Sequence, residues 1–140
     1  MSLEKSAAQK VLIVDSDQES VKAIAANLNR AGYKTLEASD GEAAVALVHK
    51  ERPDLIVLDL NFPPDSSGVS WDGYGIMEWL RGAKESRTIP IITMTGIPDS
   101  LDMERNLDLG AVGFLFKPLD YDKLLRLVRR VLGAAVTMAA

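Results

Sequence analysis

Two uninterrupted apolar runs stand out in the pattern of hydrophobic and polar residues. They cover residues 11–14 and 55–58, and no polar residue alternates with the apolar ones in either run. Such a run is typical of a strand that is buried on both faces, as in a parallel sheet covered by helices. Asp15 follows the first run and Asp59 follows the second, so both predicted strands end in a carboxylate.

Apolar residues at helical spacing predict a helix after each strand. The predicted inward-facing residues are, in chain order, Val21, Ile24, Ala25 and Leu28; Ala44, Leu47 and Val48; Ile76, Met77 and Leu80; Leu101, Met103 and Leu107; Leu124, Leu127, Val128 and Val131. Side chains that can cap a helix start occur at Asp17, at Asp40, at Asp99 or Ser100, and at Asp120. Helix-ending residues follow at Gly32, Pro53, Gly110 and Gly133.

Three further segments complete the predicted sheet. Residues 34–38 form a short mixed strand suited to a sheet edge, residues 89–94 form a strand with Pro90 near its start, and residues 113–116 form the last strand. Five strands alternating with five helices predict an α/β fold, a doubly wound parallel (βα)5 sheet. With strand order 2-1-3-4-5, a crevice opens between the first and third strands.

The strand ends at this crevice carry the residues suited to chemistry. They are Asp15 with Ser16 and Asp17, then Asp59, Thr95 and Lys117. Carboxylates, a hydroxyl and an ammonium suit phosphoryl transfer, in which a protein mainly positions groups and neutralises charge. Asp59 is the predicted nucleophile. Because clustered carboxylates repel one another, their charges also imply a cation such as Mg²⁺.

Composition narrows the possible functions. The 140 residues suit one domain, which we expect at 10–133, with an N-terminal extension at 1–9 that is disordered or a cloning artefact and a tail or cut linker at 134–140. The absence of cysteine and a single histidine, His49, exclude a disulfide framework and a histidine-rich metal cluster. The net charge of -4 argues against direct nucleic-acid binding, and no apolar run could span a membrane, so we expect a cytoplasmic protein.

Four motifs together resemble the receiver domain of two-component response regulators. They are Val-Leu-Ile-Val-Asp15, Asp-Leu-Ile-Val-Leu-Asp59-Leu-Asn61, Ile-Pro-Ile-Ile-Thr-Met-Thr95-Gly96, and Gly110-Ala-Val-Gly-Phe114-Leu-Phe-Lys117-Pro118. The resemblance implies a flavodoxin-like fold and a protein that is not an enzyme. It also implies that Asp59 accepts a phosphoryl group from a sensor histidine kinase or a histidine phosphotransfer protein.

The same resemblance implies roles for the surrounding residues. Asp15, Asp59 and the backbone carbonyl of Asn61 would hold Mg²⁺. Thr95 would move toward the phosphoryl group, Lys117 would pair with it, and the Lys117–Pro118 peptide bond would be cis. Phe114 would swing inward, so that the fourth helix, fifth strand and fifth helix form the output surface for a downstream protein, a C-terminal effector or a second copy of the chain.

Two departures from the family pattern concern the predicted site. Ser16 stands where the family usually has a second acidic metal ligand, so we expect weaker Mg²⁺ binding unless Ser16 itself, Asp17, Asp65 or Asp72 compensates. The segment between Pro64 and Trp71 is about six residues longer than usual, which a surface loop tolerates at small thermodynamic cost. It is a lid, a contact specific to a partner beside the site, or a neutral insertion.

Two alternative functions stay open at this stage. The first is a degenerate receiver, a binding module that has lost phosphorylation because of Ser16. The second is a phosphatase, because Asp15-Ser-Asp17 also looks like the nucleophile motif of haloacid-dehalogenase-type hydrolases. The nucleophile distinguishes these hypotheses, because it is Asp59 in an active receiver and Asp15 in a hydrolase.

Overall fold

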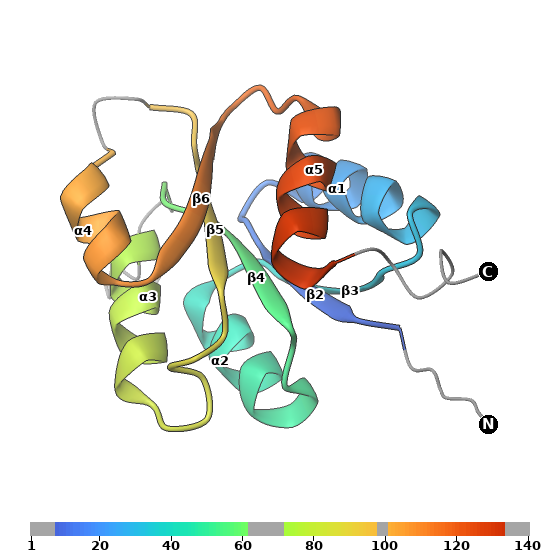
Figure 1. Cartoon of the computed structure of the whole chain (residues 1–140). Helices are drawn as coiled ribbons and strands as arrows, with labels where there is room; N and C mark the ends of the chain where they lie inside the picture. The colour runs from blue at the N-terminus through green and yellow to red at the C-terminus, as the bar shows by residue number, and fades with distance from the viewer. Residues whose placement is uncertain (1–7, 62–71, 98–100, 134–140) are drawn as a thin grey trace.

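The computed structural model describes residues 8–61, 72–97 and 101–133, and within them the chain forms a parallel five-stranded sheet (Figure 1). The strands are β2 (Lys10–Val14), β3 (Lys34–Ala38), β4 (Leu55–Asp59), β5 (Ile91–Thr95) and β6 (Ala111–Phe116). Their spatial order is β3-β2-β4-β5-β6. Counted along the chain, this is the predicted order 2-1-3-4-5, so the predicted fold is confirmed.

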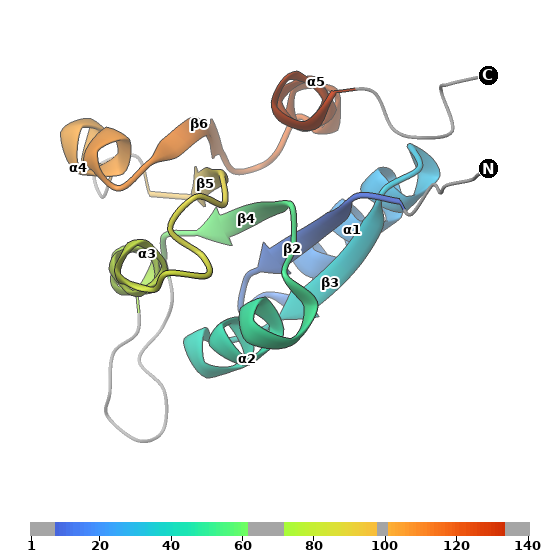
Figure 2. The same ribbon diagram turned by 60° about the horizontal axis from the view of Figure 1, so that its bottom comes forward.

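Helices cover both faces of the sheet. They are α1 (Gln18–Arg30), α2 (Gly41–Glu51), α3 (Gly73–Gly82), α4 (Met103–Asp108) and α5 (Tyr121–Leu132). Figure 2 shows α1 and α5 on one side of the sheet and α2 and α3 on the other. This winding follows from right-handed crossovers between parallel strands, and it leaves the carboxyl ends of the strands at one edge.

Each of these helices begins at an aspartate. The N-cap residues are Asp17, Asp40, Asp72, Asp102 and Asp120. In each case the carboxylate accepts a hydrogen bond from a backbone N–H of the first turn, a group with no partner inside the helix. The prediction of a cap at Asp99 or Ser100 is wrong, because α4 begins after Asp102; Asp99 and Ser100 themselves lie outside the described residues.

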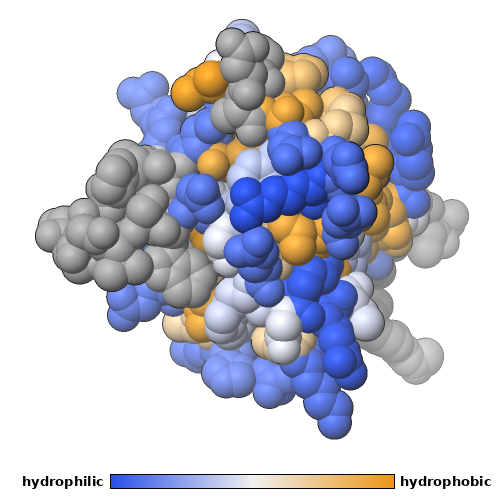
Figure 3. All heavy atoms as spheres, turned by 90° about the vertical axis from the view of Figure 1, so that its left-hand side faces the viewer, coloured by the Kyte–Doolittle hydropathy of each residue, from blue (hydrophilic) through white to orange (hydrophobic). Residues whose placement is uncertain are grey.

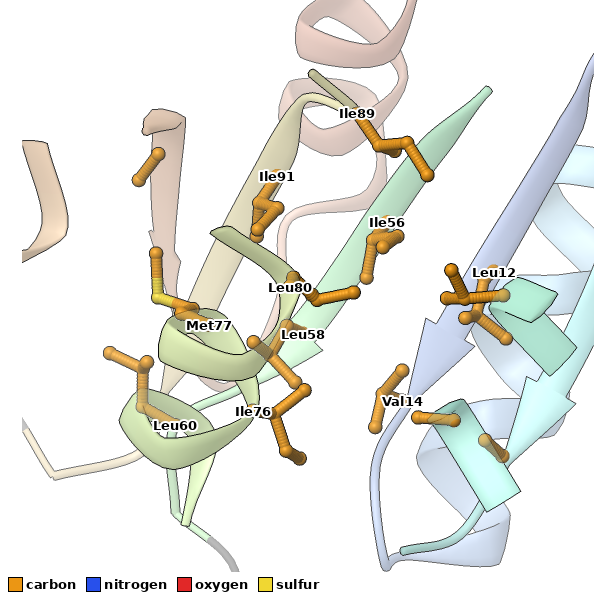
Figure 4. Close-up of a cluster of buried hydrophobic side chains, with 14 of the residues drawn as sticks. Leu12, Val14, Ile56, Leu58, Leu60, Ile76, Met77, Leu80, Ile89 and Ile91 are labelled. Carbon is orange, nitrogen blue, oxygen red and sulfur yellow. The ribbon is translucent and has the colours of Figure 1, made fainter. Parts of the chain in front are cut away.

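Two apolar clusters hold the layers together, one on each face of the sheet. The first joins β2, β4 and β5 to α1 and α5 through residues such as Ile24, Leu28 and Leu124. The second joins the sheet to α2 and α3 (Figure 4), where Met77 and Leu80 pack with side chains of β4 and β5. Burying each large apolar side chain stabilises the fold by about 1.5–3 kcal/mol relative to leaving it exposed.

The inward face of α4 differs from the prediction. Met103 and Leu107 were expected to face the core, but they are 41% and 61% exposed. Asn106 is buried instead, and Leu101, just before the helix, packs partly against the second cluster. Helical spacing alone could not show which side of so short a helix packs against the sheet, because residues that can be buried occur on both sides.

Smaller differences concern strand limits and the uncertain segments. The fourth strand begins at Ile91, after Pro90, and the fifth begins at Ala111 rather than Gly113. The predictions made for residues 1–7, for Asp65 and the longer 65–71 loop, and for the 134–140 tail lie outside the described residues. In the part of the chain that is described, no helix is long and apolar enough to cross a membrane.

Candidate functional site

The parallel sheet brings four chemically distinct strand ends to one edge. Asp15 directly follows β2, Asp59 and Thr95 are the last residues of β4 and β5, and Lys117 directly follows β6. Because β2 pairs with β4, and β4 with β5, the carboxyl ends of these strands are neighbours in space. The sequence prediction that these residues line one edge rests on this topology.

Lys117 bridges the two strand-end carboxylates. Its Nζ donates to Asp15 Oδ2 at 2.6 Å and to Asp59 Oδ2 at 3.4 Å. Both acids are buried, with Asp15 0% and Asp59 4% exposed. We call Asp15, Asp59 and Lys117 the carboxylate cluster. It contains two acids and one base, so its charges do not balance when all three are ionised.

Burial and the neighbouring charges change the pKa values of Asp59 and Lys117. Burial, together with the nearby charge of Asp15, raises the pKa of Asp59 to about 6, against the opposing effects of the Asn61 N–H and Lys117. Burial alone would lower the pKa of Lys117, but its hydrogen bond with Asp15 and the charges of both acids outweigh this and raise that pKa. Lys117 therefore stays charged, while Asp59 is the group whose ionised form is disfavoured.

Thr95, the last residue of β5, is hydrogen-bonded to Asn61, which lies two residues after the end of the neighbouring strand β4. Its Oγ1 lies 2.5 Å from Asn61 Oδ1 and 3.0 Å from the Ile97 carbonyl, both of which can accept its proton. The backbone N–H of Gly96 also donates to Asn61 Oδ1, at 3.2 Å. The Asn61 N–H donates to Asp59 Oδ1 at 3.0 Å, so Asn61 contacts both the acid and the threonine.

The donors at this edge suit a hard cation. Mg²⁺ prefers oxygen ligands and is commonly held by one or two carboxylates together with water. Asp15, Asp59 and the carbonyl of Asn61 could hold it. Among the described residues, no group of three or more histidine, cysteine, aspartate or glutamate side chains is placed to bind a metal, so this edge offers two acids.

The other candidate ligands have different surroundings. Asp17 is exposed and caps α1, where its carboxylate accepts hydrogen bonds from the Glu19 N–H and the Ser20 hydroxyl. The hydrogen bond from Ser20 lowers its pKa. Asp72 caps α3 by accepting from the Gly75 N–H at 2.8 Å. Each of these carboxylates would have to give up a capping hydrogen bond to turn fully toward a metal.

Gly73 lets the start of α3 approach the carboxyl end of β4. A Cβ at this position would lie 2.5 Å from Leu60 Cα and 2.6 Å from the Asp59 carbonyl oxygen. The Gly73 N–H donates to the Leu60 carbonyl at 3.3 Å. Only a residue without a side chain fits this close approach, so the first turn of α3 packs directly against the backbone of Asp59.

An open pocket of about 470 Å³ lies beside Lys117. It is lined by Asp17, Ser20, Gly96, Lys117, Pro118, Leu119 and Tyr121. The Lys117–Pro118 peptide bond next to it is cis. Lys117 is the one member of the carboxylate cluster in this lining.

Phe114 lies on β6, half-buried, with its ring in edge-to-face contact with Phe116 at a centroid distance of 6.1 Å. Among the described residues, large apolar side chains are exposed at Ile97, Met103, Leu107, Val112 and Phe116. We call these five residues the exposed apolar set. Figure 3, which views the side of the molecule where α4 lies, shows apolar side chains at the surface among polar ones.

The sequence matches the response regulator receiver domain family over residues 11–129, and the chain therefore belongs to that family. The probable transcriptional regulator ycf27 of Guillardia theta is 38% identical over 124 residues, which cover 89% of this chain and 45% of that protein. The chain thus spans about half the length of the curated relatives it matches.

Two solved structures share the fold over their full length. Chemotaxis protein CheY4 of Vibrio cholerae is 30% identical, with a TM-score of 0.78, covering 90% of this chain and 100% of that one. The receiver domain of sensor histidine kinase PA1611 from Pseudomonas aeruginosa, described with a magnesium ion coordinated in its active site cleft, is 30% identical, with a TM-score of 0.77, covering 91% and 100%. The predicted membership in two-component signalling is confirmed.

Three features around the site are absent from the sequence-based predictions. Asn61 has only a backbone role in them, whereas its side chain accepts a hydrogen bond from Thr95. Gly73 has no predicted role, although a glycine just after a helix cap and close to a strand end signals a tight approach. Thr93 and Asn106 are the third feature. The signal for Thr93 is a polar residue inside an otherwise apolar strand, whereas Asn106 lies in a helix and has no such signal.

Proposed function

We propose that Asp59 is the phosphorylation site of this receiver domain. A carboxylate oxygen of Asp59 attacks the phosphorus of a phosphohistidine on a sensor histidine kinase or phosphotransfer protein. The P–N bond breaks, and the imidazole leaves with the bonding electron pair and takes up a proton. The observation that carries this proposal is the Lys117 ammonium bridging Asp15 and Asp59 at the edge of the sheet.

The surrounding groups fit that reaction. With a pKa of about 6, raised mainly by burial, Asp59 is still largely ionised at pH 7 and so remains a nucleophile. When bound, Mg²⁺ supplies positive charge that offsets the phosphoryl oxygens. Asp15, Asp59 and the carbonyl of Asn61 would hold the ion, and the Lys117 ammonium would pair with a phosphoryl oxygen. The open pocket beside Lys117 gives solvent access to that side chain.

Thr95 and Phe114 link this chemistry to the surface. The Thr95 hydroxyl leaves Asn61 and the Ile97 carbonyl to hydrogen-bond the phosphoryl group, and Phe114 turns inward beside it. The face formed by α4, β6 and α5 then changes, and the members of the exposed apolar set on α4 and β6 bind the downstream protein or effector. In this role the chain is a signalling switch, as receiver domains generally are, and not an enzyme.

Intact mass spectrometry after incubation with acetyl phosphate, with and without Mg²⁺, tests this proposal. We expect a Mg²⁺-dependent gain of one phosphoryl group in the wild type and none in Asp59→Asn. Asp54→Asn is the matched control, because Asp54 lies just before the amino end of the same strand, where it accepts a hydrogen bond from the Lys10 N–H. This variant should gain the phosphoryl group normally.

Other outcomes separate the alternatives. A gain that persists in Asp59→Asn and disappears in Asp15→Asn would overturn the proposal in favour of Asp15 as the nucleophile. No gain in the folded wild type, while another receiver is labelled in parallel, would identify a degenerate receiver. The observation that favours this second candidate function is that Ser16, directly after Asp15, is neutral.

A further inference from the structure

The side of α4 that faces the sheet carries a buried polar group where an apolar one is usual. Asn106 is 1% exposed, and it meets Thr93 of β5, which is 0% exposed, and Tyr74 of α3, which is 8% exposed. We call these three residues the α4 polar cluster. The apolar residues of the helix, Met103 and Leu107, are 41% and 61% exposed, so neither belongs to the buried core.

Both N–H hydrogens of the Asn106 side-chain amide are donated in hydrogen bonds. Asn106 Nδ2 donates to Tyr74 Oη at 2.8 Å and to the Asp102 carbonyl at 2.9 Å. Its Oδ1 accepts from Thr93 Oγ1 at 2.8 Å. The cluster therefore joins three elements, α3, β5 and α4, through directional contacts that are shielded from water.

Tyr74 fixes the start of α4 as well. Its Oη accepts from the backbone N–H of Asp102 at 2.8 Å, and Asp102 is the N-cap residue of α4. The guanidinium of Arg105 lies over the Tyr74 ring, 4.5 Å from its centroid, and also donates to Glu78 Oε2 at 2.8 Å. Both the start and the middle of α4 are thus held to α3 by polar contacts.

The same cluster is connected to the proposed phosphorylation site along two paths. Thr93 and Thr95 are alternate residues of β5, so their side chains leave the strand on the same face. Tyr74 directly follows Gly73, which packs against the Asp59 carbonyl. A displacement of either the end of β5 or the first turn of α3 would change the distances within the cluster.

We propose that the α4 polar cluster sets the position of α4, and that phosphorylation of Asp59 changes its hydrogen bonds and so shifts α4 against β5 and α3. This inference rests on the proposed function for its trigger. The physical reason is that a few directional hydrogen bonds can be exchanged for another set, whereas close apolar packing resists a partial shift.

Hydrogen exchange of the amides of residues 101–110, followed by mass spectrometry, tests the first half of the proposal without phosphorylation. Asn106→Leu and Thr93→Val should each speed this exchange about tenfold or more. The first removes the acceptor of the Thr93 hydroxyl, and the second removes the donor to Asn106 Oδ1. Thr93→Ser keeps the hydroxyl and should match the wild type, as should Glu104→Ala on the exposed side of α4. Wild-type exchange in both Asn106→Leu and Thr93→Val would overturn the attachment.

The second half is tested in the same samples after acetyl phosphate treatment, with intact mass measured alongside. Phosphorylation should change the exchange of residues 101–110 in the wild type and in Thr93→Ser. Asn106→Leu should gain the phosphoryl group equally well but show no such change, and exchange in β4 reports that it is folded. A wild-type response in phosphorylated Asn106→Leu would overturn the coupling.

The two proposals fail in different ways. If the wild type takes up no phosphoryl group, the proposed function and the coupling are both overturned. The comparison of unphosphorylated variants still decides whether the cluster holds α4. If the wild type is phosphorylated and Asn106→Leu responds like it, only the present inference is overturned.

Discussion

Two buried polar clusters flank β5, and they are built in opposite ways. The carboxylate cluster at its end contains two acids and one base, and burial raises the pKa of Asp59 to about 6, so the ionised form of Asp59 is disfavoured. The α4 polar cluster is neutral, and hydrogen bonds occupy both donor hydrogens of Asn106. The first cluster is suited to binding a charged ligand, whereas the second is suited to holding a helix in place.

This contrast predicts that the two clusters respond to mutation with opposite signs. Removing the negative charge of Asp59 from the first should stabilise the protein, because it relieves an unfavourable burial. Removing a hydrogen-bonding group from the second should destabilise it, because partners are left unpaired.

The largest effect is expected in the α4 polar cluster. Asn106→Leu should lower the free energy of unfolding by about 2–3 kcal/mol, because the buried hydroxyl of Thr93 loses its acceptor and Tyr74 loses a donor. Urea denaturation measures this change. Leu107→Ala, one position along the same helix, should change it by less than about 0.5 kcal/mol because Leu107 is 61% exposed. Equal losses in both variants would contradict the polar attachment of α4.

The next effect concerns Gly73, which lies between the two clusters. Gly73→Ala should lower the free energy of unfolding by about 1–3 kcal/mol, because the new Cβ would meet the backbone of Asp59 and Leu60. Gly82→Ala in the same helix has nothing within 4 Å of the new Cβ and should stabilise by up to about 1 kcal/mol. Thermal or urea unfolding of the pair checks the sign of each change, and a stabilising Gly73→Ala would refute the close approach.

In the carboxylate cluster, Asp59→Asn should raise the free energy of unfolding by about 1–2 kcal/mol at pH 7 in the absence of divalent cations. The pKa of Asp59 is raised by burial from 3.8 to about 6. The folded protein therefore prefers the protonated form, and ionisation above that pKa costs stability. The neutral asparagine avoids this cost. Urea unfolding in EDTA measures the difference.

The pH dependence gives this prediction a second test. As the pH falls through about 6, wild-type Asp59 takes up a proton in the folded state, and the advantage of Asp59→Asn should shrink. Below about pH 3.8, where the unfolded chain is protonated as well, the advantage should be gone. An advantage that is constant with pH would show that charge burial is not its cause.

The smallest effect is expected from restoring an acid beside Asp15. Ser16→Asp should tighten Mg²⁺ binding about tenfold, because the edge then offers a third carboxylate close to Asp15 and Asp59. Isothermal titration calorimetry measures the affinity. Gln18→Asp adds the same charge on the exposed first turn of α1 and is the control for general attraction. An equal gain in both variants would contradict a ligand position at residue 16.

Some structural features of this protein can be predicted from its sequence, and others cannot. The continuous apolar runs of β2 and β4 could be recognised because strands buried on both faces leave no room for polar residues. The capping aspartates at positions 17, 40 and 120 could be recognised because capping is a local interaction. The orientation of α4 could not be recognised, because the side of this helix that is buried depends on the residues that face it in the folded protein.

The sequence by itself therefore determined the strands, their order and the four strand-end residues of the site. The strands could be predicted because the hydrophobic pattern of a strand is local. Their order could be predicted because general rules govern how parallel strands are connected. Only the tertiary structure decided that Lys117 bridges both acids, that the Asn61 side chain holds Thr95, and that Asn106 rather than Leu107 faces the sheet. Each of these contacts joins residues distant in the chain. Its partner is specified by packing in three dimensions and not by any local pattern.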